Sequence, residues 1–192
     1  MTPVHPIEAE SYRIVAERVD LSGFGPLGAA VVARVIHASA DLEYAATMVV
    51  DEAALEAGVA ALGAGAPVVV DVEMVRHGIT GVEARSFLPA AASAGMTRSA
   101  AGMALAAEAH PHGAVVVVGC APTALEEVVR LRDAGRFSPA LVIGLPVGFV
   151  GAVEAKERLR ASGLASVSNV GEKGGSAVAA AALNALVRSA GG

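Results

Sequence analysis

Short runs of β-branched apolar residues alternate with helical patterns along most of the chain, and this alternation constrains the fold more than any other feature. The runs at 68–70 and 115–118 consist of valine alone, which is typical of strands buried on both faces. Strands are predicted at 48–50, 67–72, 115–119, 141–145 and 167–170, and helices at 6–20, 26–37, 52–63, 97–109, 122–134, 152–161 and 176–188. The strand–helix alternation predicts an α/β fold with three layers, a mostly parallel sheet with helices on both faces. No repeat or linker interrupts the 192 residues, so we expect a single domain, 1–192.

Charge and cysteine content argue against several classes of function. The net charge of −5 gives no support to nucleic-acid binding, which needs a basic face. The single cysteine excludes an internal disulfide framework and fits a reducing compartment. No apolar run approaches the ~20 residues of a membrane span, and residues 1–10 lack the pattern of a signal peptide. We therefore expect a soluble, cytoplasmic protein with no membrane partner.

His37 is the leading candidate for chemistry. It follows a run of apolar residues at helical spacing that begins at Pro26, a residue suited to a first helical turn. A histidine near a helix C-terminus is favoured in its protonated form by the helix dipole. An imidazole with an ordinary pKa of about 6.5 can serve there as a proton donor near neutral pH. The residue type alone does not distinguish this role from that of a structural histidine.

A glycine pattern at 23–28 has the G-x-G-x-x-G spacing of a dinucleotide-binding turn, with Asp41 or Glu43 further along the chain. Such a turn should follow a buried strand, whereas an amphipathic helix precedes this one. Pro26 also removes an N–H that would hold pyrophosphate. We interpret the pattern as a flexible start to the next helix.

Three further segments are candidates for a ligand site. Residues 73–78 are expected to form a loop after a strand and carry Arg76 and His77, the latter more typical of a solvated loop histidine. Arg98 stands near a helix start, where its charge opposes the dipole but could grip a carboxylate with the free N–H groups. The turn 171–176 resembles an anion cradle, with Lys173 for charge and Ser176 as the expected helix cap.

Two other patterns are weaker. His110 and His112 flank a proline, with Glu108 nearby, but the spacing is poor for a metal and no second ligand cluster follows. Cys120 stands before a helix, where its pKa could be lowered, yet no partner histidine can be assigned. We predict no metal site and no catalytic cysteine.

Taken in order, several segments together resemble the precorrin-8X methylmutase family of cobalamin biosynthesis, which includes the cobalt-precorrin-8 enzymes. The resemblance covers nearly the whole chain. It is carried by 34–37 (RVIH), 71–75 (DVEMV) with 78–79, 121–125 (APTAL), 139–144 (PALVIG) with 146–151 (PVGFVG), and 173–176 (KGGS) with 179–186.

The resemblance implies an α/β homodimer with substrate sites near the subunit interface. It implies an isomerase without a cofactor, which moves a methyl group from C11 to C12 of a polycarboxylate tetrapyrrole, with His37 as the catalytic acid. A 1,5-sigmatropic shift of this kind needs only a proton on a ring nitrogen, which makes the conjugated system more electron-poor. The residues expected to bind the substrate are Arg76, Arg98, Pro122, Thr123, Lys173, Gly174, Gly175 and Ser176.

Two positions depart from the family pattern. The family usually has Asn where this chain has Cys120, and commonly has Arg where it has Glu172. These departures leave open an alternative, a relative that binds a tetrapyrrole without isomerising it.

The nearly charge-free segment 176–187 is more apolar than a solvated helix and is a second reason to expect a homodimer.

Overall fold

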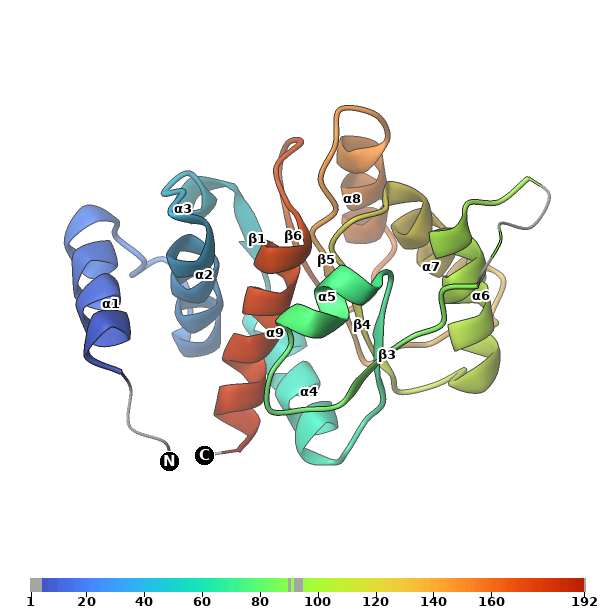
Figure 1. The fold of residues 1–192 in the computed structure, drawn as a ribbon, viewed down its shortest axis with the longest axis horizontal. Helices are drawn as coiled ribbons and strands as arrows, with labels where there is room; N and C mark the ends of the chain where they lie inside the picture. Colours follow the sequence, from blue (N-terminus) through green and yellow to red (C-terminus); the bar gives the residue numbers. More distant parts are fainter. Residues whose placement is uncertain (1–4, 90, 92–94, 192) are drawn as a thin grey trace.

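A computed structural model describes residues 5–89, 91 and 95–191. Within them a six-stranded sheet, in the order β1-β6-β5-β4-β2-β3, lies between two layers of helices (Figure 1). The strands are β1 (Met48–Val50), β2 (Val68–Val70), β3 (Ala84–Ser86), β4 (Val115–Val118), β5 (Leu141–Gly144) and β6 (Ser166–Asn169). The helices are α1 (Pro6–Arg18), α2 (Pro26–Ser39), α3 (Tyr44–Thr47), α4 (Glu52–Gly63), α5 (Glu73–Gly78), α6 (Arg98–Ala109), α7 (Pro122–Asp133), α8 (Ala152–Ala161) and α9 (Ser176–Ala190). The predicted α/β fold is confirmed.

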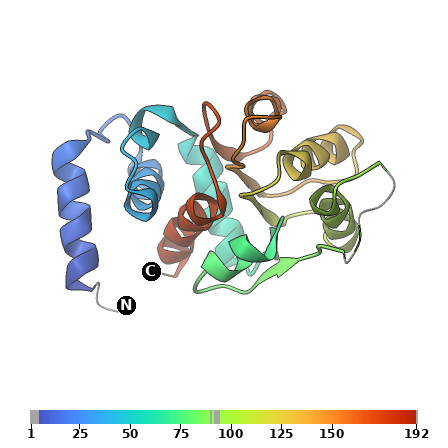
Figure 2. The same cartoon turned by 45° about the horizontal axis from the view of Figure 1, so that its top comes forward.

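The sheet is parallel except at one edge, where β1 pairs antiparallel with β6. Side chains alternate along each strand, so Val68 and Val70 enter one core while Val69 enters the other. Helices α2, α4, α5 and α9 cover the first core, and α6, α7 and α8 cover the second. Helix α1 lies outside α2, at one end of the molecule (Figure 2).

Short elements are where the sequence predictions are incomplete or wrong. Residues 73–78, expected to be a loop, form helix α5. Its charges suit the helix dipole, because Glu73 lies in the first turn and Arg76 and His77 lie in the last. Strand β3 and helix α3 were not predicted, because three or four residues are too few to show a periodic pattern.

Helix α9 is apolar because it is buried within the chain. Residues 178–186 are all buried, and the helix packs between α2, α4, α5 and the sheet. Figures 1 and 2 both show it beside α2 and α5. The reasoning that an apolar α9 points to a subunit interface is therefore wrong, since neighbouring elements of the same chain cover this surface.

The helix ends confirm the predicted start of α2 at Pro26, show a side-chain cap on α4 and correct the predicted cap of α9. Pro26 is the first residue of α2, and the Asp51 carboxylate caps α4 by accepting from the Ala54 N–H at 2.9 Å. Ser176 does not cap α9: Gly175 holds the cap position and makes no side-chain hydrogen bond. The first N–H groups of α9 therefore lack a side-chain acceptor from their cap residue.

A close approach at Gly119 brings the ends of three elements together. A Cβ atom there would lie within 2.9 Å of both Ser176 and Val75, so glycine allows β4 to end directly against α9 and α5.

Among the described residues, no helix is long and apolar enough to cross a membrane.

Candidate active site

The imidazole of His37 lies in the last turn of α2, as predicted, and faces α1. Its Nδ1 is 2.7 Å from the Ser11 hydroxyl. The ring of Tyr12 stacks on it, with centroids 5.1 Å apart and planes 19° from parallel. Two neighbouring residues of α1 therefore fix both the plane and the rotation of the ring.

The Ser11 contact assigns different roles to the two ring nitrogens. Ser11 either donates to a neutral Nδ1 or accepts from a protonated Nδ1, and in both cases it engages Nδ1. Nε2 remains as the nitrogen that can exchange a proton with a ligand. This arrangement suits a general acid. Sequence reasoning missed Ser11 and Tyr12.

His37 opens onto a small cavity of about 300 Å³ between α1, α2 and the segment after α2. The cavity is mostly apolar, with two charged residues at its rim. It is lined by Ile7, Glu10, Ser11, Ile14, Val15, Arg18, Ile36, His37, Ala40 and Leu42. The volume is at the lower end for a small-molecule site, so a large ligand would extend beyond it.

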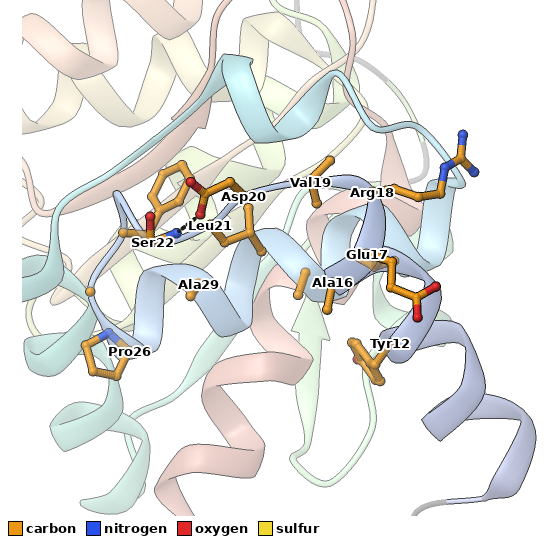
Figure 3. A pocket seen from close by; sticks show the side chains of 14 residues that line it. Tyr12, Ala16, Glu17, Arg18, Val19, Asp20, Leu21, Ser22, Pro26 and Ala29 are labelled. Carbon is orange, nitrogen blue, oxygen red and sulfur yellow. Dashed lines mark hydrogen bonds between the residues drawn. The ribbon is translucent and has the colours of Figure 1, made fainter.

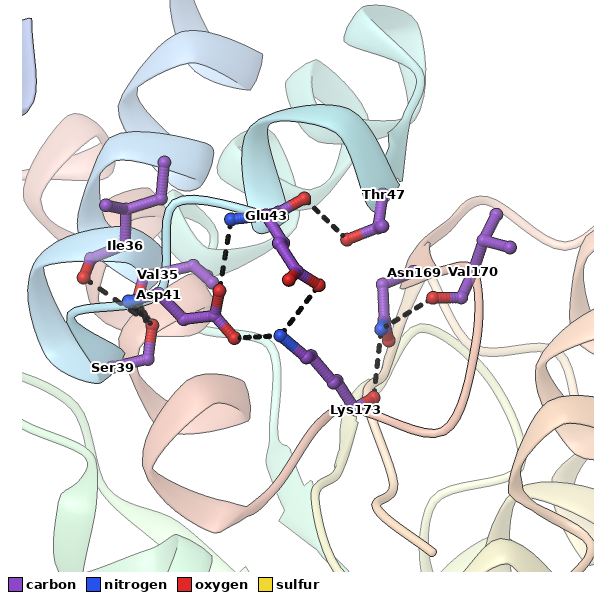
Figure 4. Close-up of polar contacts among 9 residues, drawn as sticks. All are labelled: Val35, Ile36, Ser39, Asp41, Glu43, Thr47, Asn169, Val170 and Lys173. Atoms are coloured by element: carbon purple, nitrogen blue, oxygen red, sulfur yellow. Dashed lines mark hydrogen bonds and ion pairs between the residues drawn. The ribbon is translucent and has the colours of Figure 1, made fainter. Parts of the chain in front are cut away.

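The segment after α2 connects this cavity to the turn before α9. Ala40 and Leu42 line the cavity, while Asp41 between them binds Lys173. The Lys173 Nζ atom lies 2.5 Å from the Asp41 carboxylate and 2.8 Å from that of Glu43 (Figure 4). Hydrogen bonds to these carboxylates raise the pKa of Lys173, and the bond from Lys173 lowers the pKa of Asp41. Lys173 therefore joins the glycine turn to the end of the helix that carries His37.

The turn itself requires glycine. Gly174 and Gly175 have φ angles of +159° and +131°. A Cβ atom on Gly174 would lie 2.3 Å from the Leu145 carbonyl oxygen, so a larger residue would push the turn away from the end of β5.

The two predicted arginines lie elsewhere on the molecule. Arg76 pairs with Glu73 on α5, at 2.5 Å, and His77 binds the Glu73 carbonyl oxygen through Nδ1. Arg98, the first residue of α6, donates to the Pro89 carbonyl oxygen at 2.8 Å. These side chains come from α5 and α6, so the structure does not gather all predicted site residues around His37.

The loop after β4 is organised by a buried carboxylate. Asp71 accepts hydrogen bonds from the N–H groups of Gly119, Cys120 and Ala121, and burial raises its pKa. The loop leads to Pro122, the first residue of α7. The next residue, Thr123, bonds Thr97 through their hydroxyls at 2.7 Å, which joins the starts of α6 and α7.

The environment of Cys120 does not favour a nucleophile, and His110 packs against an aromatic ring. Burial and the nearby Asp71 raise the pKa of Cys120, the opposite of what a nucleophilic thiol needs. The ring of His110 packs edge-on against Phe87, with centroids 5.9 Å apart.

The glycine pattern at 23–28 is already occupied by a carboxylate of the chain. Glu52 accepts from the N–H groups of Leu27 and Gly28, at 2.7 and 3.0 Å. Helix α1, not a strand, precedes the pattern. An anionic side chain thus caps α2 where a dinucleotide would place its pyrophosphate, so the nucleotide interpretation is excluded.

Comparison with known proteins identifies the family. The family model for precorrin-8X methylmutase matches residues 6–189. The chain is 40% identical to the precorrin-8X methylmutase of Pseudomonas aeruginosa, over 94% of this chain and 93% of that protein. It is also 40% identical to the cobalt-precorrin-8 methylmutase of Methanocaldococcus jannaschii, over 82% and 77% of the two chains. This chain belongs to the precorrin-8X methylmutase family.

The fold agrees with a solved methylmutase. The crystal structure of the precorrin-8X methylmutase from Thermus thermophilus superposes with a TM-score of 0.89 at 41% identity, covering 97% of this chain and 98% of the other. A methylmutase is an isomerase, because it moves a methyl group within one molecule. Family membership therefore supports an isomerase and does not favour the alternative of a non-catalytic tetrapyrrole carrier.

A second, larger cavity adjoins the His37 cavity and shares Val15 and Arg18 with it. It measures about 830 Å³ and is bounded by α1, the segment 18–25 and α2 (Figure 3). Tyr12 lines it, but among the described residues it includes neither His37 nor any predicted substrate-binding residue. We assign it no part in the chemistry.

Proposed function

We propose that this protein catalyses the 1,5-sigmatropic shift of a methyl group from C11 to C12 of precorrin-8X or its cobalt form, giving hydrogenobyrinic or cobyrinic acid. The observation that carries the proposal is the Ser11–His37 pair beside a cavity at the end of α2. Family membership supplies the substrate class. The imidazole that Ser11 and Tyr12 hold in place supplies the acid that the reaction needs.

In the proposed mechanism, His37 Nε2 donates its proton to a ring nitrogen of the macrocycle, while Ser11 holds Nδ1. Protonation draws electron density from the conjugated system and weakens the bond between C11 and its methyl group. That bond breaks as the bond to C12 forms, and the proton returns to His37. Substrate and product have the same atoms and the same oxidation level, so the reaction needs no oxidant or reductant.

The carboxylates of the substrate would be held along the edge of the sheet where the parallel strands end. Lys173, Gly174, Gly175 and Ser176 follow β6, and Pro122 and Thr123 follow β4. Arg76 and Arg98 add charge from α5 and α6. Ligands of open α/β sheets gather at this edge. A flat polycarboxylate that lies across the edge would reach these groups while one ring contacts His37, which agrees with the small size of the cavity.

The proposed homodimer would cover the exposed loop after β5. Phe149 and Val150 are 96% and 88% exposed. Their loop adjoins the glycine turn, because the Gly148 N–H donates to the Glu172 carbonyl oxygen at 3.1 Å. A second copy bound here would bury apolar surface and bring a subunit interface next to the substrate site.

We further propose that the enzyme works in the cytoplasm.

Sedimentation at micromolar concentration tests the dimer. We expect the wild type to be a dimer and Phe149→Asp to dissociate, because a charge would be buried in an apolar interface. Ile7→Asp is the control, since Ile7 is also exposed, at 74%, but lies on α1. A monomeric wild type in the presence of substrate would contradict an interface site.

The visible spectrum tests the reaction itself. Methyl migration changes the conjugation of the macrocycle, so mixing purified protein with precorrin-8X should convert its absorption to that of the product. Binding with no spectral conversion would support the carrier alternative instead.

A further inference from the structure

Lys156 on α8 is a fully buried lysine for which the proposed mechanism has no direct use. Its ammonium donates to the Asn169 side-chain oxygen at 3.0 Å, the Gly171 carbonyl oxygen at 2.5 Å and the Lys173 carbonyl oxygen at 2.8 Å. Three acceptors match the three donors of an ammonium. A buried charge is costly unless it is bonded in this way, so the site is built to hold it.

The other contacts of the turn also direct its carbonyl groups toward the protein. The Asn169 side-chain N–H₂ donates to the Lys173 carbonyl oxygen at 2.9 Å (Figure 4). The Gly148 N–H donates to the Glu172 carbonyl oxygen. The carbonyl groups of three successive residues, 171 to 173, are therefore bound on the inner side of the turn.

Because carbonyl groups of the turn point toward the protein, the N–H groups of the same peptides point away from it. In a planar trans peptide the C=O and N–H point in opposite directions. The Gly171 and Lys173 carbonyl groups point at Lys156, so the N–H groups of Glu172 and Gly174 point away from it. Within the part of the chain that the structure describes, neither N–H has a protein acceptor. These donors remain available to an anion.

We propose that Lys156 is a positioning residue: it holds the turn 171–175 so that the N–H groups of Glu172 and Gly174 face the carboxylates of the macrocycle. This inference rests on the proposed function, in which the turn binds substrate. Lys156 touches no substrate atom in this account. It acts through the backbone of the turn, and its loss should weaken binding more than it slows the chemistry at His37.

The electrostatic surroundings make the interaction sensitive to pH. Burial, and to a lesser degree Arg160, lower the pKa of Lys156 to about 8, while Glu172 acts in the opposite direction. The side chain of Lys173 points away, to Asp41 and Glu43. Above that pKa the neutral amine has two donors for three acceptors and turns a lone pair toward one of them, which loosens the turn.

The first test compares Lys156→Met with Arg160→Met. Arg160 lies one turn along the same helix and donates to Ser168 and to the Asn169 carbonyl oxygen, not to the turn 171–175. We expect Lys156→Met to weaken binding of precorrin-8X by about tenfold to a hundredfold, as for a misplaced binding group, with kcat at saturation little changed. Arg160→Met should keep the wild-type affinity.

Wild-type affinity in Lys156→Met would overturn the inference while leaving the proposed function intact, provided that the wild type converts substrate. A wild type that neither binds nor converts would overturn the proposed function and this inference with it. If Lys156→Met does not fold, the affinity of the His37→Ala variant is measured from about pH 7 to about pH 9.5, where Lys156 titrates and the loss of the catalytic acid makes turnover slow. Affinity should fall across this range. A flat profile would overturn the inference.

Discussion

The orientation of the His37 ring depends on two residues of α1 that come 25 and 26 positions earlier in the chain. Ser11 is the one that hydrogen-bonds the ring, through its hydroxyl at Nδ1. Without it, the ring would keep its stacking on Tyr12 but lose the bond that leaves Nε2 as the proton donor. The α1–α2 contact is thus part of the catalytic apparatus in this account.

The Ser11→Ala variant tests that role. We expect kcat to fall by about tenfold, the effect of one lost hydrogen bond of ~1.4 kcal/mol, with little change in substrate affinity. Ser39→Ala is the control, because Ser39 lies in the same last turn of α2, but its hydroxyl donates to the Val35 carbonyl oxygen and accepts from the Asp41 N–H, without a bond to His37. A Ser11→Ala enzyme with the wild-type kcat would show that stacking alone orients the ring.

At the scale of the element, α2 ends in a left-handed residue that is not glycine. Ala40 has φ of +53° and holds the cap position, with its N–H bonded to the Ile36 carbonyl oxygen. Left-handed backbone costs a residue with a Cβ atom roughly 1–2 kcal/mol. This conformation turns the chain sharply, so that Asp41 meets Lys173 directly after the helix.

Ala40→Gly should therefore raise the free energy of unfolding by about 0.5–1 kcal/mol, because glycine relieves the strain but gains freedom in the unfolded chain. Ala38→Gly, two residues earlier and still inside the helix, should lower it by about 0.5–1 kcal/mol. Urea unfolding of both variants measures the difference. Equal destabilisation by the two glycines would contradict the strain at Ala40.

At the scale of the whole molecule, the apolar runs and their spacing were enough to predict a mostly parallel sheet with helices on both faces, although not the edge strand β3. The strand order and the direction of the edge strand could not be predicted, because β1 pairs antiparallel with β6, whose residues lie 117 to 121 positions further along the chain (Val50 with Val167, Met48 with Asn169). Helix α9 shows the same limit. The apolar composition of α9 suggests a subunit interface. Only the packing of α2, α4 and α5 against it shows that this helix is buried within the chain.

The candidate site was also only partly predictable from the sequence. His37 and the glycine turn could be found from residue types near helix ends. Ser11, Lys156 and the Asp41–Lys173 pair could not, since each depends on segments far apart in sequence meeting in the folded chain. From the sequence alone, Lys173 is expected to be a cation available to a ligand. In the structure it pairs with the carboxylates of Asp41 and Glu43.

The central claim is that His37 delivers the proton that triggers methyl migration, and one comparison tests it most directly. Wild type and His37→Ala are titrated with precorrin-8X for affinity and then followed by absorption for conversion. His37 lies in the last turn of α2 and is only part-buried, so the variant should fold and bind as the wild type does. Its conversion rate should fall by the ~100-fold to 10,000-fold typical of a lost general acid. Conversion by His37→Ala at the wild-type rate would contradict the claim.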